Sequence, residues 1–139
     1  MSAGLILDTC VLIAAERQII AIDEVLRAMR SKHGEIDIAI SAISVVELTH
    51  GIYRAKTDVH RVRRRDFADV AFRNLVVHQV TLEIAQLAGR IEGEQAAKGI
   101  AIPFEDLIIG ATALHLGFDV ATHNVKHFQL IPSLNVVAI

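Results

Sequence analysis

Three acidic residues in this sequence lie beside strongly apolar stretches, where a carboxylate needs a partner. Asp8 follows the apolar run at residues 5–7, Glu47 lies in SAISVVELTHGIY, and Asp106 lies in IPFEDLIIGATAL. Because an unpaired carboxylate is unfavourable to bury, each of them must be solvated, cap a helix or hold a cation. The chemical question is whether the three acids act separately or together.

Helix capping accounts for each acid taken alone. Asp8 can be the N-cap of a helix, and Ser44 with Glu47 fits the capping box, in which the glutamate reaches back to the serine amide. Pro103 suits the first position of a helix, which leaves Asp106 in a first turn whose dipole favours negative charge. Capping ties each acid only to the start of its own helix, so it gives no reason for the three to meet.

Alternating strands and helices are expected to position these acids. Short apolar segments rich in β-branched residues predict strands at residues 5–7, 36–40, 75–80 and 118–122, with a fifth at 135–139. Apolar positions at helical spacing predict helices over residues 22–29 and 84–91, and a nearly all-apolar helix over 106–116. Because the strands are continuous apolar runs, they are expected to be covered on both faces. We predict a single domain over residues 1–139, an α/β fold with a mostly parallel, twisted sheet of four to five strands and helices on both faces.

A shared cation is the interpretation in which the acids act together. In a parallel α/β sheet, ligand sites lie beyond the carboxyl ends of the strands, which is where Asp8 is placed. Carboxylates gathered there would repel one another, and a divalent cation bound by oxygen ligands, Mg²⁺ or Mn²⁺, removes that repulsion. We choose Asp106 rather than Glu105, because neighbouring helical residues point about 100° apart and Asp106 shares a face with the apolar Ile109.

Basic residues are concentrated in one part of a chain whose net charge is −2. Residues 54–73 hold seven of the fourteen Lys and Arg residues and only three acidic ones, so this stretch is positive and the remainder negative. A basic stripe on an otherwise acidic protein indicates a polyanionic partner, although a solvated helix face explains it equally well. The candidate contacts are Arg54, Lys56, Arg61, Arg63, Arg64 and Arg65.

The remaining candidates for chemistry are one cysteine and two histidines. Cys10 is the only cysteine, which excludes an internal disulfide, and we interpret it as a packed thiol in a reducing compartment. The segment MSAGLILD lacks the basic region of a signal peptide, and no apolar run approaches the roughly 18 residues of a membrane span, so we expect a cytoplasmic protein. His123 and His127 are four residues apart, as in a helical zinc pair, but THNVKHF has no helical flank and predicts a loop.

Four segments, taken in order, resemble the PIN-domain ribonucleases and among them the VapC toxins: LILDTCVLIA, AISAISVVELTHGIYRA, IPFEDLIIGATALHLGFDVATHNVKHF and IPSLNVV. The resemblance implies a Mg²⁺- or Mn²⁺-dependent endoribonuclease that is the toxin of a type II toxin–antitoxin pair. Such an enzyme cleaves RNA phosphodiester bonds with metal-activated water. The resemblance also implies a homodimer and a cognate antitoxin protein that inhibits it.

Carried over position by position, the resemblance makes Asp8, Glu47 and Asp106 the catalytic and metal-binding acids. Asn124 stands where a fourth acid is expected, and we include it in the catalytic set. Its amide oxygen can bind Mg²⁺ but brings no charge, which puts a second metal site in doubt.

Three hydroxyl residues are expected to support these acids. Thr9 and Thr122 match supporting positions of the family, and Ser44 is taken as a third supporting residue. The basic stripe is expected to bind RNA phosphates, with an affinity that falls as salt rises.

Two other functions stay open at this stage. The first is a PIN-like module that binds RNA or protein without cutting, which the amide at Asn124 would suit. The second is a phosphoryl-transfer enzyme in which Asp8 is the nucleophile, although the Asp-x-Asp pattern of such enzymes is missing because position 10 is a cysteine.

Overall fold

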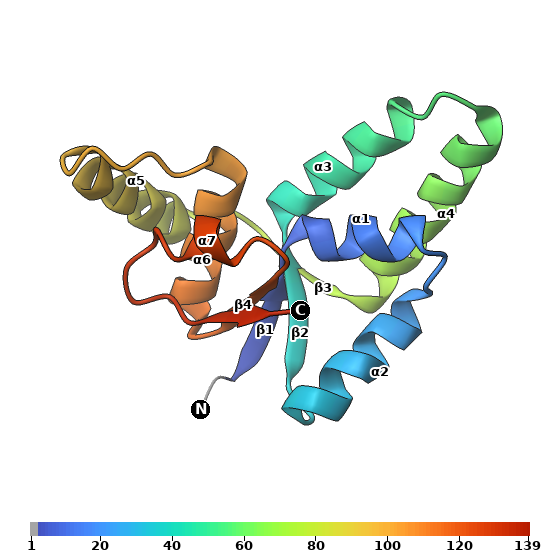
Figure 1. Cartoon of the computed structure of the whole chain (residues 1–139), viewed down its shortest axis with the longest axis horizontal. Helices are drawn as coiled ribbons and strands as arrows, with labels where there is room; N and C mark the ends of the chain where they lie inside the picture. Colours follow the sequence, from blue (N-terminus) through green and yellow to red (C-terminus); the bar gives the residue numbers. More distant parts are fainter. Residues whose placement is uncertain (1–2) are drawn as a thin grey trace.

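Five parallel strands form the central sheet of the structure, a computed structural model that describes residues 3–139. The strands are β1 (Gly4–Leu7), β2 (Asp37–Ser41), β3 (Val76–His78), β4 (Asp119–Thr122) and β5 (Val136–Ala138), in the spatial order β3-β2-β1-β4-β5 (Figure 1). All the neighbouring pairs are parallel. The five predicted strands are therefore confirmed, and the sheet is entirely rather than mostly parallel.

Seven helices in the described part of the chain connect the strands. They are α1 (Thr9–Arg17), α2 (Ile22–His33), α3 (Ala42–Tyr53), α4 (Asp58–Asn74), α5 (Leu82–Ala96), α6 (Phe104–Leu116) and α7 (Val125–Phe128). The helices predicted over residues 22–29, 84–91 and 106–116 are confirmed within α2, α5 and α6. Among the described residues, none of these helices combines the length and apolar character that crossing a membrane requires.

Two hydrophobic cores lie on opposite faces of the sheet. Successive side chains of a strand point to opposite faces, so Ile6 of β1 enters one core while Leu5 and Leu7 enter the other. The Ile6 core is completed by α5, α6 and α7, and the other core by α1, α2, α3 and α4. Burial on both faces explains why β1 is a continuous apolar run, and it confirms the helices on both sides (Figure 1).

The order of the strands places a topological switch point between β1 and β4. The chain passes from β1 outward to β2 and β3, and then returns to place β4 on the other side of β1. Connections that leave a sheet in opposite directions separate at this point, and ligands of α/β sheets bind in the opening. The residues that follow β1 and β4 are therefore the ones that the fold directs to a site.

Helix α6 packs closely enough to reach the same edge of the sheet. Residues 107–113 are all buried, as expected for the nearly all-apolar helix predicted there. A Cβ atom at Gly110 would displace the end of the Ile131 side chain, so the helix lies close to the segment that precedes β5. Helix α6 also contacts β1 and β4, and its first turn carries Asp106.

Candidate active site

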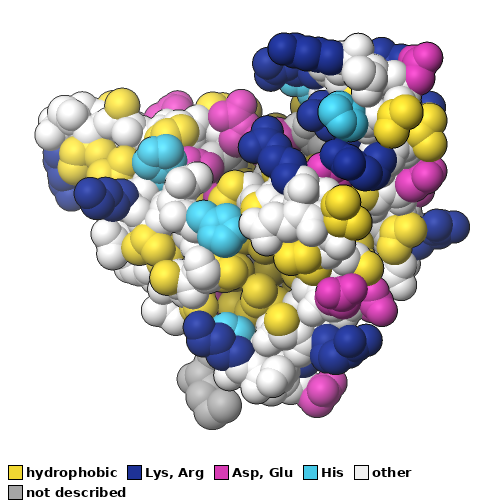
Figure 2. Space-filling model, turned by 45° about the vertical axis from the view of Figure 1, so that its right-hand side comes forward, with side chains coloured by type: hydrophobic (Ala, Val, Ile, Leu, Met, Phe, Trp, Pro, Cys, Tyr) yellow, Lys and Arg dark blue, Asp and Glu magenta, His cyan; other side chains and the backbone are white. Residues whose placement is uncertain are grey.

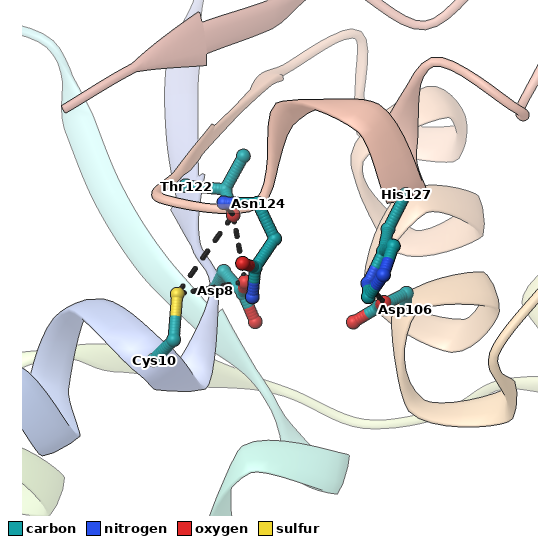
Figure 3. A network of polar contacts seen from close by, with 6 residues as sticks. All are labelled: Asp8, Cys10, Asp106, Thr122, Asn124 and His127. Carbon is teal, nitrogen blue, oxygen red and sulfur yellow. Dashed lines mark hydrogen bonds and ion pairs between the residues drawn. The ribbon is translucent and has the colours of Figure 1, made fainter.

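Asp8 lies at the carboxyl end of β1 and is only 4% exposed. Although it is the N-cap residue of α1, its side chain makes no capping hydrogen bond. Its Oδ2 atom instead accepts hydrogen bonds from Thr122 Oγ1 (2.7 Å) and Cys10 Sγ (2.9 Å) (Figure 3). Within residues 3–139 its Oδ1 atom accepts none. Capping therefore does not account for this carboxylate.

Cys10 has a larger part in the site than the packed thiol we predicted. Burial, followed by the hydrogen bond to Asp8, raises the pKa of Cys10 to about 11. The thiol therefore keeps its proton at neutral pH and donates it to Asp8. The sequence signal was its position two residues after the acid, at the first turn of α1.

Glu47 is held by a chain of hydroxyl groups that links α1 to α3. Thr9 Oγ1 donates to Glu47 Oε1 (2.7 Å) and lies 2.7 Å from Ser44 Oγ. Because the single hydroxyl proton of Thr9 goes to the carboxylate, Ser44 must be the donor to Thr9. The predicted capping box is wrong: the N-cap of α3 is Ser41, which accepts from Ile43 N (3.2 Å), and Ser44 lies inside the helix.

Asp106 lies in the first turn of α6 and faces Asp8 across the site (Figure 3). The N-cap of this helix is Pro103, one position earlier in the helix than predicted for the proline. The Asp106 side chain is 14% exposed, whereas its neighbour Glu105 is exposed. Its Oδ2 atom lies 2.9 Å from His127 Nδ1, so the second carboxylate oxygen is the one available to a ligand.

His127 is a site residue that sequence analysis missed. It lies on α7, where we predicted a loop, and its partner Asp106 is 21 residues away in sequence. His123 has a different contact, because its Nδ1 atom lies 3.0 Å from Ile139 O. The spacing of the two histidines therefore did not indicate a shared site, and no sequence signal identified His127 as the partner of Asp106.

Thr122 joins Asp8 to Asn124. Its side chain is fully buried, and Oγ1 both donates to Asp8 and accepts from Asn124 N (2.8 Å). Asn124 is the N-cap residue of α7 but makes no capping hydrogen bond with its side chain. Figure 3 shows that side chain extending beside Asp8, on the side that faces Asp106. The Asn124 amide therefore lies between Asp8 and Asp106, and its role as an oxygen donor stays a prediction.

The charged forms of Glu47 and Asp106 are both disfavoured. For each of them burial is the largest cause that raises the pKa above its usual value. The negative charges of Asp8 and Glu105 raise both pKa values further, against the hydrogen bonds from the hydroxyl and imidazole partners. Acids at the starts of α1 and α6 and in the second turn of α3 therefore lie close enough to repel one another.

A hard divalent cation fits this set of donors. The donors are carboxylate, amide and hydroxyl oxygens, and a cation would remove the repulsion that raises the pKa values. Among residues 3–139, no three His, Cys, Asp or Glu side chains are grouped closely enough to share one ion directly. Mg²⁺ usually keeps several waters and takes one or two carboxylates from a protein. The arrangement therefore suits an ion that is held partly through water.

A second buried carboxylate, Glu16 of α1, anchors part of the basic stripe. It is 7% exposed and pairs with Arg63 (3.4 Å) and Arg64 (3.9 Å) of α4. Arg64 also donates to Gly51 O of α3 (2.6 Å). These contacts tie α1, α3 and α4 together, so two of the predicted RNA-contacting residues have structural partners.

The rest of the basic stripe contains both paired and unpaired cations. Arg61 pairs with Asp58 (2.8 Å) and donates to Ala55 O (3.2 Å), both next to the turn between α3 and α4. Three of the six candidate RNA contacts are exposed and form no ion pair within the described residues 3–139: Arg54, Lys56 and Arg65.

The sequence is similar to known ribonucleases over most of its length. The PIN domain family matches residues 5–132. Ribonuclease VapC1 of Rickettsia felis is 29% identical over 136 residues, which cover 98% of this chain and 96% of that protein. Ribonuclease VapC19 of Mycobacterium tuberculosis is 32% identical over 112 residues, which cover 79% of this chain and 81% of that protein.

The fold is also similar to solved structures. One of them is VapBC2 from Rickettsia felis, bound to a DNA fragment from its promoter. A chain of that structure superposes with a TM-score of 0.82 at 23% identity, over 97% of this chain and 98% of that chain. VapBC-1 from nontypeable Haemophilus influenzae gives a TM-score of 0.80 at 21% identity, over 97% of both chains. These likenesses confirm the predicted PIN-like α/β fold.

Proposed function

This chain belongs to the PIN-domain family and, within it, to the VapC ribonucleases, the toxins of type II toxin–antitoxin systems, and we propose that it hydrolyses RNA phosphodiester bonds at Asp8, Glu47 and Asp106. The observation that carries the proposal is that Asp8 and Asp106 face each other across the site, and that their charges raise the pKa of Glu47. None of the three acids has a Lys or Arg partner within residues 3–139. Hydrolysis of an anionic substrate by anionic groups requires a cation between them.

The donor set suits one divalent cation. Asp8 and Asp106 would hold Mg²⁺ or Mn²⁺, directly or through water, with Glu47 and Asn124 as further oxygen donors. When bound, the ion stabilises charge that develops on the phosphodiester and makes the attacking water more acidic.

The residues of the chain hold these donors in place. Thr122 and Cys10 occupy Oδ2 of Asp8 and leave Oδ1 free for the site. Thr9 orients Glu47, whose raised pKa makes it a better proton acceptor than an ordinary exposed glutamate. We therefore assign Glu47 the role of general base toward the attacking water.

The proposed partners are RNA, a cognate antitoxin protein and a second copy of the chain, acting as a single PIN-like domain in the cytoplasm. The VapBC names of the solved relatives support the antitoxin. Large apolar side chains on α3 and α4 support a protein interface, since Val46, Tyr53 and Val59 are 61%, 70% and 75% exposed. We place the homodimer contact on this face.

Incubation of the purified chain with RNA tests the proposed function. The account predicts cleavage in Mg²⁺ or Mn²⁺ and none in EDTA, with activity restored when the metal is returned. The amide at Asn124, in place of a fourth acid, favours one alternative, a PIN-like module that binds RNA without cutting. RNA that is bound but intact under both conditions would establish that alternative instead.

A further inference from the structure

One short segment, residues 122–127, supplies a hydrogen bond to each of the two acids that face each other across the site. Thr122, at the end of β4, donates to Oδ2 of Asp8 (2.7 Å). His127, on α7, has its Nδ1 atom 2.9 Å from Oδ2 of Asp106. Figure 3 shows this segment crossing above the space between the acids, with His127 directed toward Asp106. The two acids therefore take their orientation in part from the same segment.

The segment is held in place on either side of His127. Thr122 and Phe128 are fully buried, and Phe128 belongs to the core that α5 and α6 complete. Beyond α7, Gln95 of α5 donates to Leu130 O (2.8 Å). The His127 side chain is itself 51% exposed, so burial of the ring does not explain where it lies. Its position follows from the fixed backbone and from the hydrogen bond to the acid.

The chemistry of Asp106 gives the direction of this hydrogen bond. An ionised carboxylate only accepts, so Nδ1 of His127 must carry the proton. Figure 2 shows a group of Lys and Arg side chains over the α3–α4 hairpin, and no Lys or Arg within residues 3–139 pairs with Asp106. The imidazole is therefore the donor that occupies Oδ2 of this acid.

Each of the two acids is left with one unoccupied oxygen. Oδ2 of Asp8 accepts from Thr122 and from Cys10, which uses both lone pairs of that atom. Oδ2 of Asp106 accepts from His127. Within residues 3–139, Oδ1 of neither carboxylate accepts a hydrogen bond. A cation that requires both oxygens of one carboxylate would have to displace these donors.

We propose that His127 is a positioning residue that holds Asp106 as a one-oxygen ligand, and that with the matching arrangement at Asp8 it makes the site select Mg²⁺ or Mn²⁺ over Ca²⁺. The inference rests on the proposed function and adds the basis of its cation selectivity. Ca²⁺ takes about six to eight oxygen ligands, often both oxygens of one carboxylate, whereas Mg²⁺ takes one or two carboxylates and keeps several waters. Two acids that present one oxygen each suit the smaller ion and leave Ca²⁺ short of ligands.

Three variants test this role. His127→Ala removes the donor, whereas His127→Asn keeps an N–H donor at the place of Nδ1. The matched control is His123→Ala, because His123 is an exposed histidine of the same segment whose Nδ1 atom contacts Ile139 O rather than an acid. Calorimetric titration of each purified chain with MnCl₂ and with CaCl₂ measures the two affinities without any need for catalysis. Urea unfolding checks that each variant is folded.

The wild type should bind Mn²⁺ more tightly than Ca²⁺. His127→Ala should lose about tenfold in Mn²⁺ affinity, the lower end of what removal of a group that hydrogen-bonds a metal ligand costs. Its Ca²⁺ affinity should hold or rise, because Asp106 is then free to turn and present both oxygens. His127→Asn and His123→Ala should keep the preference of the wild type. Equal losses for both cations in His127→Ala, or a His127→Asn variant that behaves like His127→Ala, would overturn the inference.

A spectroscopic measurement on the wild type is independent of how the His127 variants fold. In the metal-free protein, at a pH where the ring is neutral, long-range ¹H–¹⁵N correlation spectra should show the proton of His127 on Nδ1. In Asp106→Ala the proton should move to Nε2, because the acceptor that fixes the tautomer is gone. A wild-type ring that carries its proton on Nε2 would overturn the assigned role.

The outcomes separate this inference from the proposed function. If the wild type cleaves RNA in Mg²⁺ but His127→Ala matches His123→Ala in both affinities, the positioning role is overturned and the ribonuclease assignment stands. Equal affinity of the wild type for Mn²⁺ and Ca²⁺ would overturn the selectivity in the same way. A wild type that binds no Mn²⁺ and leaves RNA intact would overturn both.

Discussion

Two buried carboxylates near opposite ends of helix α1 are compensated in different ways. Glu16, in the last turn, is 7% exposed and lies against two guanidinium groups from α4. Asp8, at the N-cap, is 4% exposed and receives one hydroxyl and one thiol hydrogen bond, with no cation among residues 3–139. The charges around Asp8 are those of other acids, whose pKa values rise in its presence.

The comparison shows how a structural acid differs from a functional one. A buried charge is tolerated when the fold supplies a counter-charge, and Glu16 uses its two arginines to hold α1 against α4. At Asp8 the fold supplies hydrogen bonds that orient the carboxylate but leaves its charge uncompensated. Its neighbours Glu47 and Asp106 have raised pKa values, and perturbed acids of this kind mark functional sites. In the proposed function a divalent cation supplies the counter-charge.

Replacement of the uncompensated acid should have the largest effect on activity. Asp8→Asn keeps the shape of the side chain and removes its charge, so RNA cleavage in Mg²⁺ should fall on the order of 10³-fold. Thermal stability in EDTA should hold or rise, because the change relieves repulsion with Asp106. The matched control is Asp37→Asn, an exposed residue that should leave the cleavage rate unchanged. A cleavage rate near that of the wild type would remove Asp8 from the mechanism.

Loss of the hydroxyl that orients Glu47 should have a smaller effect. Thr9→Val preserves the shape of the side chain but leaves Glu47 without a donor and Ser44 without its acceptor. We expect kcat to fall about ten- to a hundredfold, with the folded state destabilised by about 1 kcal/mol. The hydrogen bond lowers the pKa of Glu47, so its loss should move the acidic limb of the pH–rate profile to higher pH. Thr9→Ser, which keeps the hydroxyl, should restore both kcat and stability. If the acidic limb of the pH–rate profile of Thr9→Val does not shift, Glu47 is not the base.

The compensated acid should affect stability rather than metal binding. Glu16→Gln leaves Arg63 and Arg64 without their carboxylate, so the free energy of unfolding should fall by about 1–3 kcal/mol. The lower part of this range is expected because both arginines are partly exposed. Urea unfolding measures the loss, and calorimetric titration with Mn²⁺ should give an unchanged affinity. A large loss of Mn²⁺ affinity would contradict the division between the two acids.

The pH dependence of stability should depend on the metal. The folded-state pKa values of Glu47 and Asp106 lie above their ordinary values of 4.5 and 3.8. At a pH between the ordinary and the raised pKa of either acid, the folded chain therefore binds more protons than the unfolded chain. In EDTA their contribution to stability is therefore present at low pH and is lost as pH rises through the raised values. Because the ion binds the deprotonated acids, the gain in Tm from Mg²⁺ should grow over the same interval.

The double variant Glu47→Gln with Asp106→Asn provides the control for this titration. In EDTA its stability should no longer fall as these two acids lose their protons. In Mg²⁺ its gain in Tm should no longer depend on pH over this interval. If Mg²⁺ raises Tm equally at every pH in the wild type, the ion binds elsewhere.

Local patterns in the sequence predicted the five strands, which are short apolar runs, and the helices α2, α5 and α6, whose apolar residues are regularly spaced or nearly continuous. The segment of α7 was wrongly predicted to be a loop. The position of Asp8 could also be predicted, since parallel strands direct their carboxyl ends to one edge. Asp106 follows no strand, and its position depends on how the buried helix α6 packs against the sheet. Capping was less predictable, because Ser41 and Ser44 both stand before apolar residues. The pattern alone could not show that Ser41 is the cap while Ser44 lies inside the helix and contacts Thr9.

Contacts between distant parts of the chain were beyond the sequence. Glu16 and Arg63 are 47 residues apart, and nothing in the composition of residues 54–73 distinguishes a paired arginine from a free one. The same limit applies to His127, whose role depends on how α7 packs against α6.

The most direct test of the central claim is anomalous diffraction from crystals of the wild-type chain soaked in Mn²⁺. The account predicts an anomalous peak between Asp8 and Asp106, within direct or water-mediated reach of both, and its loss in crystals of Asp8→Asn. An active protein whose crystals bind Mn²⁺ only elsewhere, or bind none between these two acids, would contradict it.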